Sequence, residues 1–397
     1  MGVHKVAMLT AGGLAPCLSA TVGALIEAWT ATDPSVELVA YRDGYAGLLT
    51  GRSVLIGPET RAAAKRLTDL GGSPIGNSRV KLTNADDCAR RGLVTPGADP
   101  LEVAARQLAA DGVDVLHTIG GDDTSTTAAD LATWLCAHDY PLTVVSLPKT
   151  IDNDIHPVTQ SLGALTAAEQ SSLYARHVMA EHSANPRMLV VHEVMGRGCG
   201  WLTAAAAAHY QRWAQEATEV PGLVEAGRWA IHGLYIPEVT FDVEAEIERL
   251  NGVMDRHGNV NLFVSEGAGV DGIVAEMARS GHDVARDPFG HPKLDTLNPG
   301  AFLADQIGVG IHADKTLVAK SGYFARSAPA NGADLALIVR FVAEAVAGAL
   351  EGVGGLVGQD DDADSELRII EFERVAGHKT FDPHVEWFAQ LAADIAS

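Results

Sequence analysis

Carboxylates, glycines and a lysine follow two apolar runs in the stretch from Val113 to Asp154. The first run ends in Gly-Gly-Asp122-Asp123-Thr, and a helical pattern follows at once. Glycines let the backbone approach an anion, and a helix N-terminus presents free N–H groups and a positive dipole end to phosphate. Asp122 and Asp123 would repel a phosphate unless a cation lay between them. Mg2+ is usually held by one or two carboxylates plus substrate phosphates, so a magnesium and phosphate site is expected near residue 121.

The second apolar run ends in Pro-Lys149-Thr150-Ile-Asp152-Asn-Asp154. This segment places a cation, a hydroxyl group and two more carboxylates after a predicted strand. Ligands of open α/β sheets bind at the carboxyl ends of the strands. We therefore expect both loops to contribute to one site.

Apolar runs alternate with helical patterns along most of the chain, and this alternation predicts parallel α/β architecture. A strand, glycine loop and helix occur first at residues 6–30 and again at residues 187–213. The acidic run at residues 359–366 predicts an exposed loop. The predicted strands are 6–9, 37–41, 113–119, 142–147, 187–194 and 260–264.

Composition narrows the class of protein. The 397 residues are 47% hydrophobic and 20% charged, which suits a globular chain long enough for two domains. A net charge of -22 argues against nucleic acid and against anionic membrane surfaces. The apolar region at residues 335–356 carries three charged side chains and predicts a packed helix, not a membrane span. The N-terminus lacks signal-peptide features and the four cysteines lack paired spacing, so a reducing cytoplasm is expected.

Seven motifs in order, GGLAP, GGSPIGNSR, GGDDT, PKTIDND, MGRGCG, SEG and GYFAR, resemble the phosphofructokinase family over roughly residues 3–350. The resemblance implies an α/β fold of two similar three-layer α/β/α (Rossmann-like) domains, with the active site in the cleft between them. It implies a donor domain of residues 1–160 plus about 324–355. The sugar-phosphate domain would comprise residues 161–323 plus the C-terminal tail.

The same resemblance assigns roles to individual residues. Asp152 matches the base that removes the proton from the sugar's 1-hydroxyl group, Asp122 matches the magnesium-linked aspartate, and Asp154 matches the second carboxylate of its motif. The implied catalytic residues are Asp152, Lys149, Asp123 and Arg197. The pyrophosphate-binding residues are Gly12, Gly13, Arg79, Lys81 and Lys149. The implied substrate-binding residues are Thr150, Ile151, Asp152, Arg187, Met195, Gly196, Arg197, Glu266, Lys315, Tyr323, Phe324, Ala325 and Arg326. Lys320 is the alternative to Lys315 as the 6-phosphate ligand.

Two positions distinguish the phosphoryl donor. ATP-using members of the family typically have glycine where this chain has Asp123 and Lys149, and the pyrophosphate-using members resemble this sequence at both. A carboxylate at position 123 fills the space for a nucleotide's α-phosphate and repels it, whereas Lys149 adds a cation for a compact donor. Both substitutions favour pyrophosphate over ATP.

The resemblance thus implies Mg2+-dependent, reversible transfer of a phosphoryl group from pyrophosphate to the 1-hydroxyl group of fructose 6-phosphate, in glycolysis or gluconeogenesis. The products are fructose 1,6-bisphosphate and phosphate. A homodimer or homotetramer that shares the sugar-phosphate site across subunits is expected. Three alternatives stay open: an ATP-dependent enzyme, a pyrophosphate-dependent kinase of another sugar phosphate such as sedoheptulose 7-phosphate, and a silent regulatory subunit.

Overall fold

The computed structural model describes residues 2–140, 142–217, 219–279, 284–285, 297–375 and 377–396. The chain forms two compact units, each assembled from two stretches of sequence. Unit 1 comprises Met1–Thr166 and Arg326–Lys379, and unit 2 comprises Ala167–Ala325 and Thr380–Ser397.

Unit 1 is built on a seven-stranded sheet with the strand order β11-β10-β5-β4-β1-β2-β3. The central strands are parallel, and the edge strands β3 and β11 run antiparallel to their neighbours. Every residue of β4 is buried, as expected for a parallel strand that is covered on both faces. The strands are β1 (Lys5–Thr10), β2 (Glu37–Tyr41), β3 (Ser53–Leu55), β4 (Val115–Gly120), β5 (Thr143–Pro148), β10 (Gly355–Asp360) and β11 (Glu366–Ile370).

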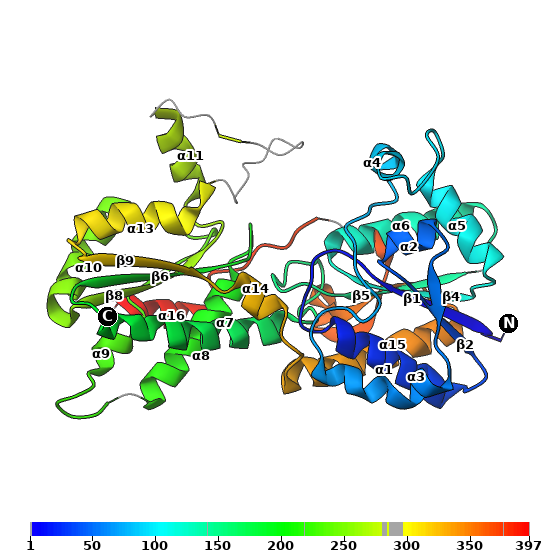
Figure 1. Cartoon of the computed structure of the whole chain (residues 1–397), viewed down its shortest axis with the longest axis horizontal. Coiled ribbons are helices and arrows are strands. Elements are labelled where there is room, and N and C mark those ends of the chain that lie inside the picture. The colour runs from blue at the N-terminus through cyan, green and yellow to red at the C-terminus, as the bar shows by residue number, and fades with distance from the viewer. Residues whose placement is uncertain are drawn as a thin grey trace. The chain divides into compact units, whose positions relative to one another are not determined.

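Helices cover both faces of this sheet (Figure 1). One face carries α1 (Leu18–Thr32) and α15 (Gly332–Glu351), together with α3 (Pro58–Ala63) and η1 (Ala64–Asp69). The other carries α2 (Tyr45–Leu49), α5 (Pro100–Ala110) and α6 (Asp122–Ala137), which enclose one apolar core with the sheet. The short helix α4 (Ala85–Arg90) lies between η1 and α5 in the chain.

Unit 2 contains a four-stranded parallel sheet with the order β7-β8-β6-β9. Its strands are β6 (Met188–Val194), β7 (Gly233–Tyr235), β8 (Asn259–Ser265) and β9 (Lys315–Lys320). Its helices and 3-10 turns are α7 (Ala164–Met179, which starts at the end of unit 1), η2 (Ala180–Ser183), α8 (Trp201–Ala217), α9 (Ala226–Trp229), α10 (Val243–His257), α11 (Val270–Arg279), α13 (Pro299–Gly310), α14 (Gly322–Arg326) and α16 (Glu386–Ala396).

Strand periodicity divides the core of unit 2 between the two faces of its sheet. Leu189 and Leu262 pack with α10 and α13 on one face. The alternate residues His192 and Phe263 contact the aromatic rings of Tyr174 in α7 and Tyr210 in α8. Successive side chains of a strand point to opposite faces, so each face takes every second residue. Both units are α/β with helices on both faces, which confirms the expected fold class.

Local sequence signals located several elements correctly. α5 begins at Pro100, and the Asp99 side chain accepts a hydrogen bond from Leu101 N at 2.9 Å, as the Asp-Pro pair predicts. The prediction of an exposed loop at residues 359–366 was right for the middle of the run and wrong for its ends, because residues 361, 362, 364 and 365 are exposed in the connection between β10 and β11. Gln359 and Asp360 end β10, Glu366 begins β11, and Asp360 is fully buried. Arg368 and Arg374 form ion pairs with the Asp360 carboxylate, so this buried residue belongs to the sheet edge.

The division of the C-terminal part differs from the expected assignment. Residues 356–379 lie in unit 1, whereas the tail after about residue 355 was expected in the other domain. The reason is that β10 pairs with β5 and carries β11 with it. Among the residues that the structure describes, no helix is long and apolar enough to cross a membrane.

Candidate active site

The loop between β1 and α1 forms one wall of a pocket in unit 1. Gly12 has a φ of +86°, and a Cβ there would lie 3.3 Å from Thr124 Oγ1 and 3.4 Å from Lys149 Nζ. Glycine suits both the backbone conformation and the close approach. The pocket has a volume of about 530 Å3, and its lining includes Gly12, Gly13, Arg79 and Arg326. Two arginines beside a glycine loop give this pocket the positive charge and the open backbone that suit an anion.

Lys149 lies beneath the glycine loop at the end of β5. Its side chain is 2% exposed, and Nζ donates a hydrogen bond to the carbonyl oxygen of Gly13. The pKa of the Lys149 ammonium is lowered to about 8, chiefly by burial and also by the neighbouring Arg79, against the opposing effects of Cys17, Asp152 and Asp154. The positive charge predicted after β5 is therefore the buried Lys149 ammonium group, which contacts the glycine loop.

Asp122 and Asp123 occupy the first turn of α6. The Asp123 carboxylate forms an ion pair with Lys81 Nζ at 2.6 Å, and both side chains remain substantially exposed. Asp122 is more buried, and burial raises its pKa; the carboxylates of Asp123 and Asp154 also raise it, while His378 opposes them. Within the described residues, the buried Asp122 Oδ1 has no hydrogen-bond partner.

The loop after β5 is held by its own side chains. The Thr150 hydroxyl donates to Asp154 Oδ1 at 3.1 Å and accepts from the backbone N–H of Asp152 at 3.1 Å. Asn153 has a φ of +56°, and its Oδ1 accepts from Ser161 N at 2.7 Å. The backbone around Asp152 is thus fixed on both sides. A side chain on a loop held in this way needs little reorganisation before a reaction.

The carboxylates of unit 1 fit a magnesium ion that is shared with substrate. The described residues contain no cluster of three or more His, Cys, Asp or Glu side chains that could enclose a metal. Asp122 and Asp154 nevertheless both face the His378 ring, and Asp122 Oδ1 lacks a hydrogen-bond partner in the part of the chain that the structure describes. Mg2+ commonly takes one or two carboxylates and completes its shell with water and phosphate oxygens. The residues present fit that arrangement.

In unit 2, Met195, Gly196 and Arg197 follow β6, and Glu266 follows the adjacent β8. Glu266 Oε1 accepts hydrogen bonds from Gly196 N at 3.3 Å and Arg197 N at 3.1 Å. Gly196 has a φ of +146°, and a Cβ there would lie 2.5 Å from the carbonyl oxygen of Cys199. The sheet therefore brings these predicted substrate residues together at the carboxyl ends of parallel strands.

Tyr323, Phe324, Ala325 and Arg326 form most of α14. Tyr323 is 76% exposed, Phe324 is partly exposed, and Ala325 is buried. A Cβ on Gly322 would collide with the Met195 side chain, so α14 begins beside the Met195 loop. Arg326 is the first residue of the chain's return to unit 1 and lines the pocket described above.

The structure does not bring Arg187 and Lys315 together with Met195 and Arg197. Lys315 begins β9 and pairs in register with Met188 at the start of β6, so Arg187 and Lys315 lie at the amino end of this sheet. The eight residue-to-residue steps from Arg187 to Met195 span about 25 Å of extended chain.

Arg187 and Lys320 each contact a different set of groups in unit 2. The Arg187 guanidinium donates to Asp255 Oδ1 at 2.7 Å and to the carbonyl oxygens of Ile311 and His312. Lys320, the alternative to Lys315, lies at the carboxyl end of β9 and forms an ion pair with Glu193 at 2.7 Å.

Sequence reasoning missed His378. Its ring nitrogens lie 3.8 Å from Asp122 Oδ2 and 3.6 Å from Asp154 Oδ2. The residue lies beyond the last recognised motif and more than two hundred residues after Asp154. No local pattern marks it, because its position depends on a backbone bridge between Ile155 and His378.

Two α/β units with a glycine loop, a buried lysine and carboxylates at strand ends define a phosphate-handling protein. The family model described as Phosphofructokinase matches residues 5–349, and the chain belongs to this family. It is 57% identical to the pyrophosphate–fructose 6-phosphate 1-phosphotransferase of Propionibacterium freudenreichii, with 99% of this chain and 98% of that protein covered. It is 56% identical to the protein of the same name from Mastigamoeba balamuthi, over 99% of this chain and 96% of the other.

The fold resembles a solved structure as well. The pyrophosphate-dependent phosphofructokinase of Marinobacter aquaeolei matches with a TM-score of 0.72 and 19% identity, over 98% of this chain and 92% of that one. At this level of identity the match concerns the fold alone.

Proposed function

We propose that this chain is a Mg2+-dependent enzyme that transfers a phosphoryl group reversibly between pyrophosphate and the 1-hydroxyl group of fructose 6-phosphate. Four relatives at 54–57% identity, matched over nearly their whole length, carry the name of this activity. The bond broken in pyrophosphate and the bond formed in fructose 1,6-bisphosphate are closer in energy than with ATP. Both the glycolytic and the gluconeogenic direction are therefore accessible.

The observation that carries this proposal is the position of Lys149 beside Gly12 and Gly13. The buried ammonium group supplies positive charge under a loop that is shaped for an anion. Asp123, paired with Lys81, stands at the start of α6 and adds negative charge at the helix end that would otherwise attract a further phosphate. A compact donor suits this arrangement better than a nucleotide triphosphate.

In this proposal some residues of unit 1 bind the phosphates and another accepts the proton. Lys149, Arg79 and Arg326 bind and orient the phosphates. The oxygen of the sugar's 1-hydroxyl group attacks the terminal phosphorus, its proton passes to Asp152, and the bridging P–O bond breaks to release phosphate. Asp122 and Asp154 would hold Mg2+, which neutralises charge on the phosphoryl oxygens when bound.

We expect pyrophosphate, and not ATP, to support turnover. Initial rates with Mg2+ and fructose 6-phosphate are compared at matched donor concentrations in one assay. The variant Asp123→Gly should raise the ratio of kcat/KM for ATP over pyrophosphate by about tenfold, because removing the carboxylate opens space and lowers repulsion by roughly 1.4 kcal/mol. The control is Asp86→Gly, which removes another exposed carboxylate from a helix's first turn, that of α4.

The same assay tests the alternatives. A rate with ATP alone, unchanged by Asp123→Gly, would assign the donor to ATP. A higher kcat/KM with sedoheptulose 7-phosphate than with fructose 6-phosphate would identify sedoheptulose 7-phosphate as the preferred substrate. Binding of fructose 6-phosphate without turnover by the purified oligomer would point to a silent subunit.

The positions of the basic residues at the two ends of the sheet in unit 2 support a homo-oligomer. Arg187 and Lys315 lie at its amino end, whereas Arg197 and Glu266 lie at its carboxyl end. One copy cannot direct both sets onto one small sugar phosphate. We propose that a second copy supplies Arg187 and Lys315.

Mixing two inactive variants tests this sharing. Arg187→Ala and Arg197→Ala are each expected to be inactive alone. After subunit exchange, half of the dimers would be mixed and each would hold one intact site, so activity returns to about a quarter of the wild-type value. Mixed oligomers, verified by native mass spectrometry, that stay inactive would contradict the proposal.

The proposed location is the cytoplasm. No disulfide joins any of the four cysteines, all of which lie among the described residues. Unpaired thiols suit a reducing compartment.

A further inference from the structure

The part of unit 1 that follows β11 carries His378 to the carboxylates of the candidate metal site. We call residues 371–375 and 377–379 the C-terminal arm. His378 forms an antiparallel bridge with Ile155, and the next residue, Lys379, donates its backbone N–H to the carbonyl oxygen of Asp154 at 2.8 Å. The arm is thus hydrogen-bonded directly to the loop that carries Asp152 and Asp154.

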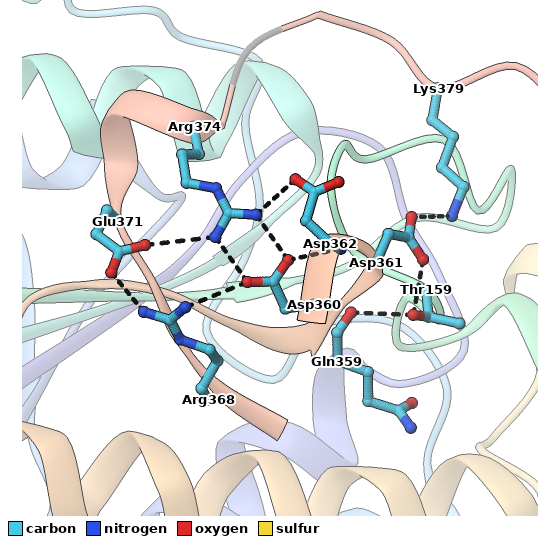
Figure 2. Close-up of polar contacts among 9 residues, drawn as sticks. All are labelled: Thr159, Gln359, Asp360, Asp361, Asp362, Arg368, Glu371, Arg374 and Lys379. Carbon is cyan, nitrogen blue, oxygen red and sulfur yellow. Dashed lines mark hydrogen bonds and ion pairs between the residues drawn. The ribbon is translucent and has the colours of Figure 1, made fainter. Parts of the chain in front are cut away.

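Figure 2 shows the ion pairs that hold the arm at Arg374 and at Lys379, the residues that precede and follow His378 in the chain. Before it, Arg374 donates to both oxygens of the fully buried Asp360, at 2.6 and 2.7 Å, and to Asp362 at 2.7 Å. After it, Lys379 Nζ contacts Asp361 Oδ2 at 2.7 Å. A bidentate arginine–carboxylate pair restricts geometry more than a single contact.

The acidic run therefore has a structural use. Asp360, Asp361 and Asp362 are consecutive residues, and each accepts a hydrogen bond from a cation of the arm. Thr159 Oγ1 also donates to Asp361 Oδ1, which links the run to the segment after the Asp152 loop. The contacts fix the arm relative to the loop at both ends.

The His378 ring lies between one carboxylate oxygen of Asp122 and one of Asp154. Nε2 faces Asp122 Oδ2 and Nδ1 faces Asp154 Oδ2. Thr150 occupies Asp154 Oδ1, and Asp122 Oδ1 is the buried atom without a hydrogen-bond partner among the described residues. The ring thus lies beside one oxygen of Asp122, and the other oxygen has no hydrogen-bond partner among the described residues.

We propose that His378 is a positioning residue: held by the C-terminal arm, it orients Asp122 and Asp154 for a divalent cation and so sets the affinity of the site for that cation. The inference rests on the proposed function, because it concerns the same metal site. Partners that hold the second oxygen or nitrogen of a metal ligand commonly change metal affinity by about 10–100-fold when removed. His378 has this relation to the two carboxylates.

The test measures Mn2+ binding to the enzyme without substrate, from the loss of the free-ion signal in electron paramagnetic resonance. We expect His378→Ala to raise the Mn2+ Kd by about tenfold. His378→Gln keeps an amide N–H within reach of Asp122 and should restore part of the affinity. Arg374→Ala should weaken binding as well, because the arm loses its bidentate anchor. His4→Ala and Arg106→Ala, at exposed positions of unit 1, serve as controls.

Activity gives a second readout. In His378→Ala the KM for Mg2+ should rise by a similar factor, while kcat at saturating Mg2+ should change little. Unchanged Mn2+ affinity in His378→Ala, or tighter binding because the ring competes with the ion, would overturn the inference.

Asp122→Ala separates this failure from a failure of the metal site. If Asp122→Ala abolishes Mn2+ binding and His378→Ala leaves it unchanged, the metal site is assigned correctly and His378 does not position its ligands. If neither variant changes the affinity, the carboxylates do not hold the ion and the inference falls with the metal assignment. Rates with pyrophosphate would still decide the proposed reaction.

Discussion

Asp152→Asn is expected to lower kcat by about 10²–10⁴-fold, the usual contribution of a general base, while the KM for fructose 6-phosphate changes much less. The amide has nearly the shape of the carboxylate but cannot take the proton of the 1-hydroxyl group. Thr150 still accepts the backbone N–H of residue 152 and donates to Asp154, so the loop should keep its conformation.

Steady-state kinetics with saturating pyrophosphate measure both parameters. Asp139→Asn is a matched control, because Asp139 is an exposed carboxylate of unit 1 and asparagine tolerates its φ of +54°. Equal losses in sugar-phosphate binding and in turnover would show that Asp152 binds substrate without acting as the base.

Lys149→Met is expected to lower kcat/KM for pyrophosphate by about 10²–10³-fold, and at the same time to stabilise the protein. The activity falls because the buried cation beside Gly12 and Gly13 is lost. The stability rises because the buried ammonium group is held in an unfavourable environment, as its pKa of about 8 against an ordinary 10.5 indicates. That difference corresponds to about 3 kcal/mol, from which the lost hydrogen bond to Gly13 subtracts roughly 1 kcal/mol.

The extra stability of Lys149→Met over the wild type is expected to decrease as the pH rises. Below about pH 8 Lys149 is protonated in both the folded and the unfolded state, so the full cost of the buried charge is present. Between about pH 8 and 10.5 the folded state releases the proton first, and wild-type stability rises relative to the variant.

Urea unfolding at pH 7 and at pH 10 measures the difference. Lys65→Met, at an exposed position in η1, is the control and should not stabilise the protein. A stability loss in Lys149→Met at pH 7 would mean that the contacts of the ammonium group outweigh its burial.

The sequence by itself determined the elements and the local shape of the site. Glycine after an apolar run, as at Gly12 and Gly196, specifies backbone conformations that few other residues adopt. Parallel strands place the residues after them at one edge of a sheet, so Asp122, Lys149 and Asp152 could be assigned to one region before any coordinates. These inferences depend on neighbours in the chain, and local sequence contains that information.

Only the tertiary structure decided the burial and the long-range partners. The burial of Lys149 depends on Gly13, which lies 136 residues earlier in the chain. Asp360 became a core residue because β10 joined the sheet beside β5 and Arg374 folded back onto it.

The tertiary structure also decided the positions of Arg187, Lys315 and His378. Arg187 and Lys315 lie far from Arg197 because they stand at the amino ends of their strands and Arg197 follows the carboxyl end of one. His378 reached Asp122 and Asp154 through a bridge between distant segments. Pairings across such separations are chosen by packing and charge in the folded chain, and no short stretch of sequence specifies them.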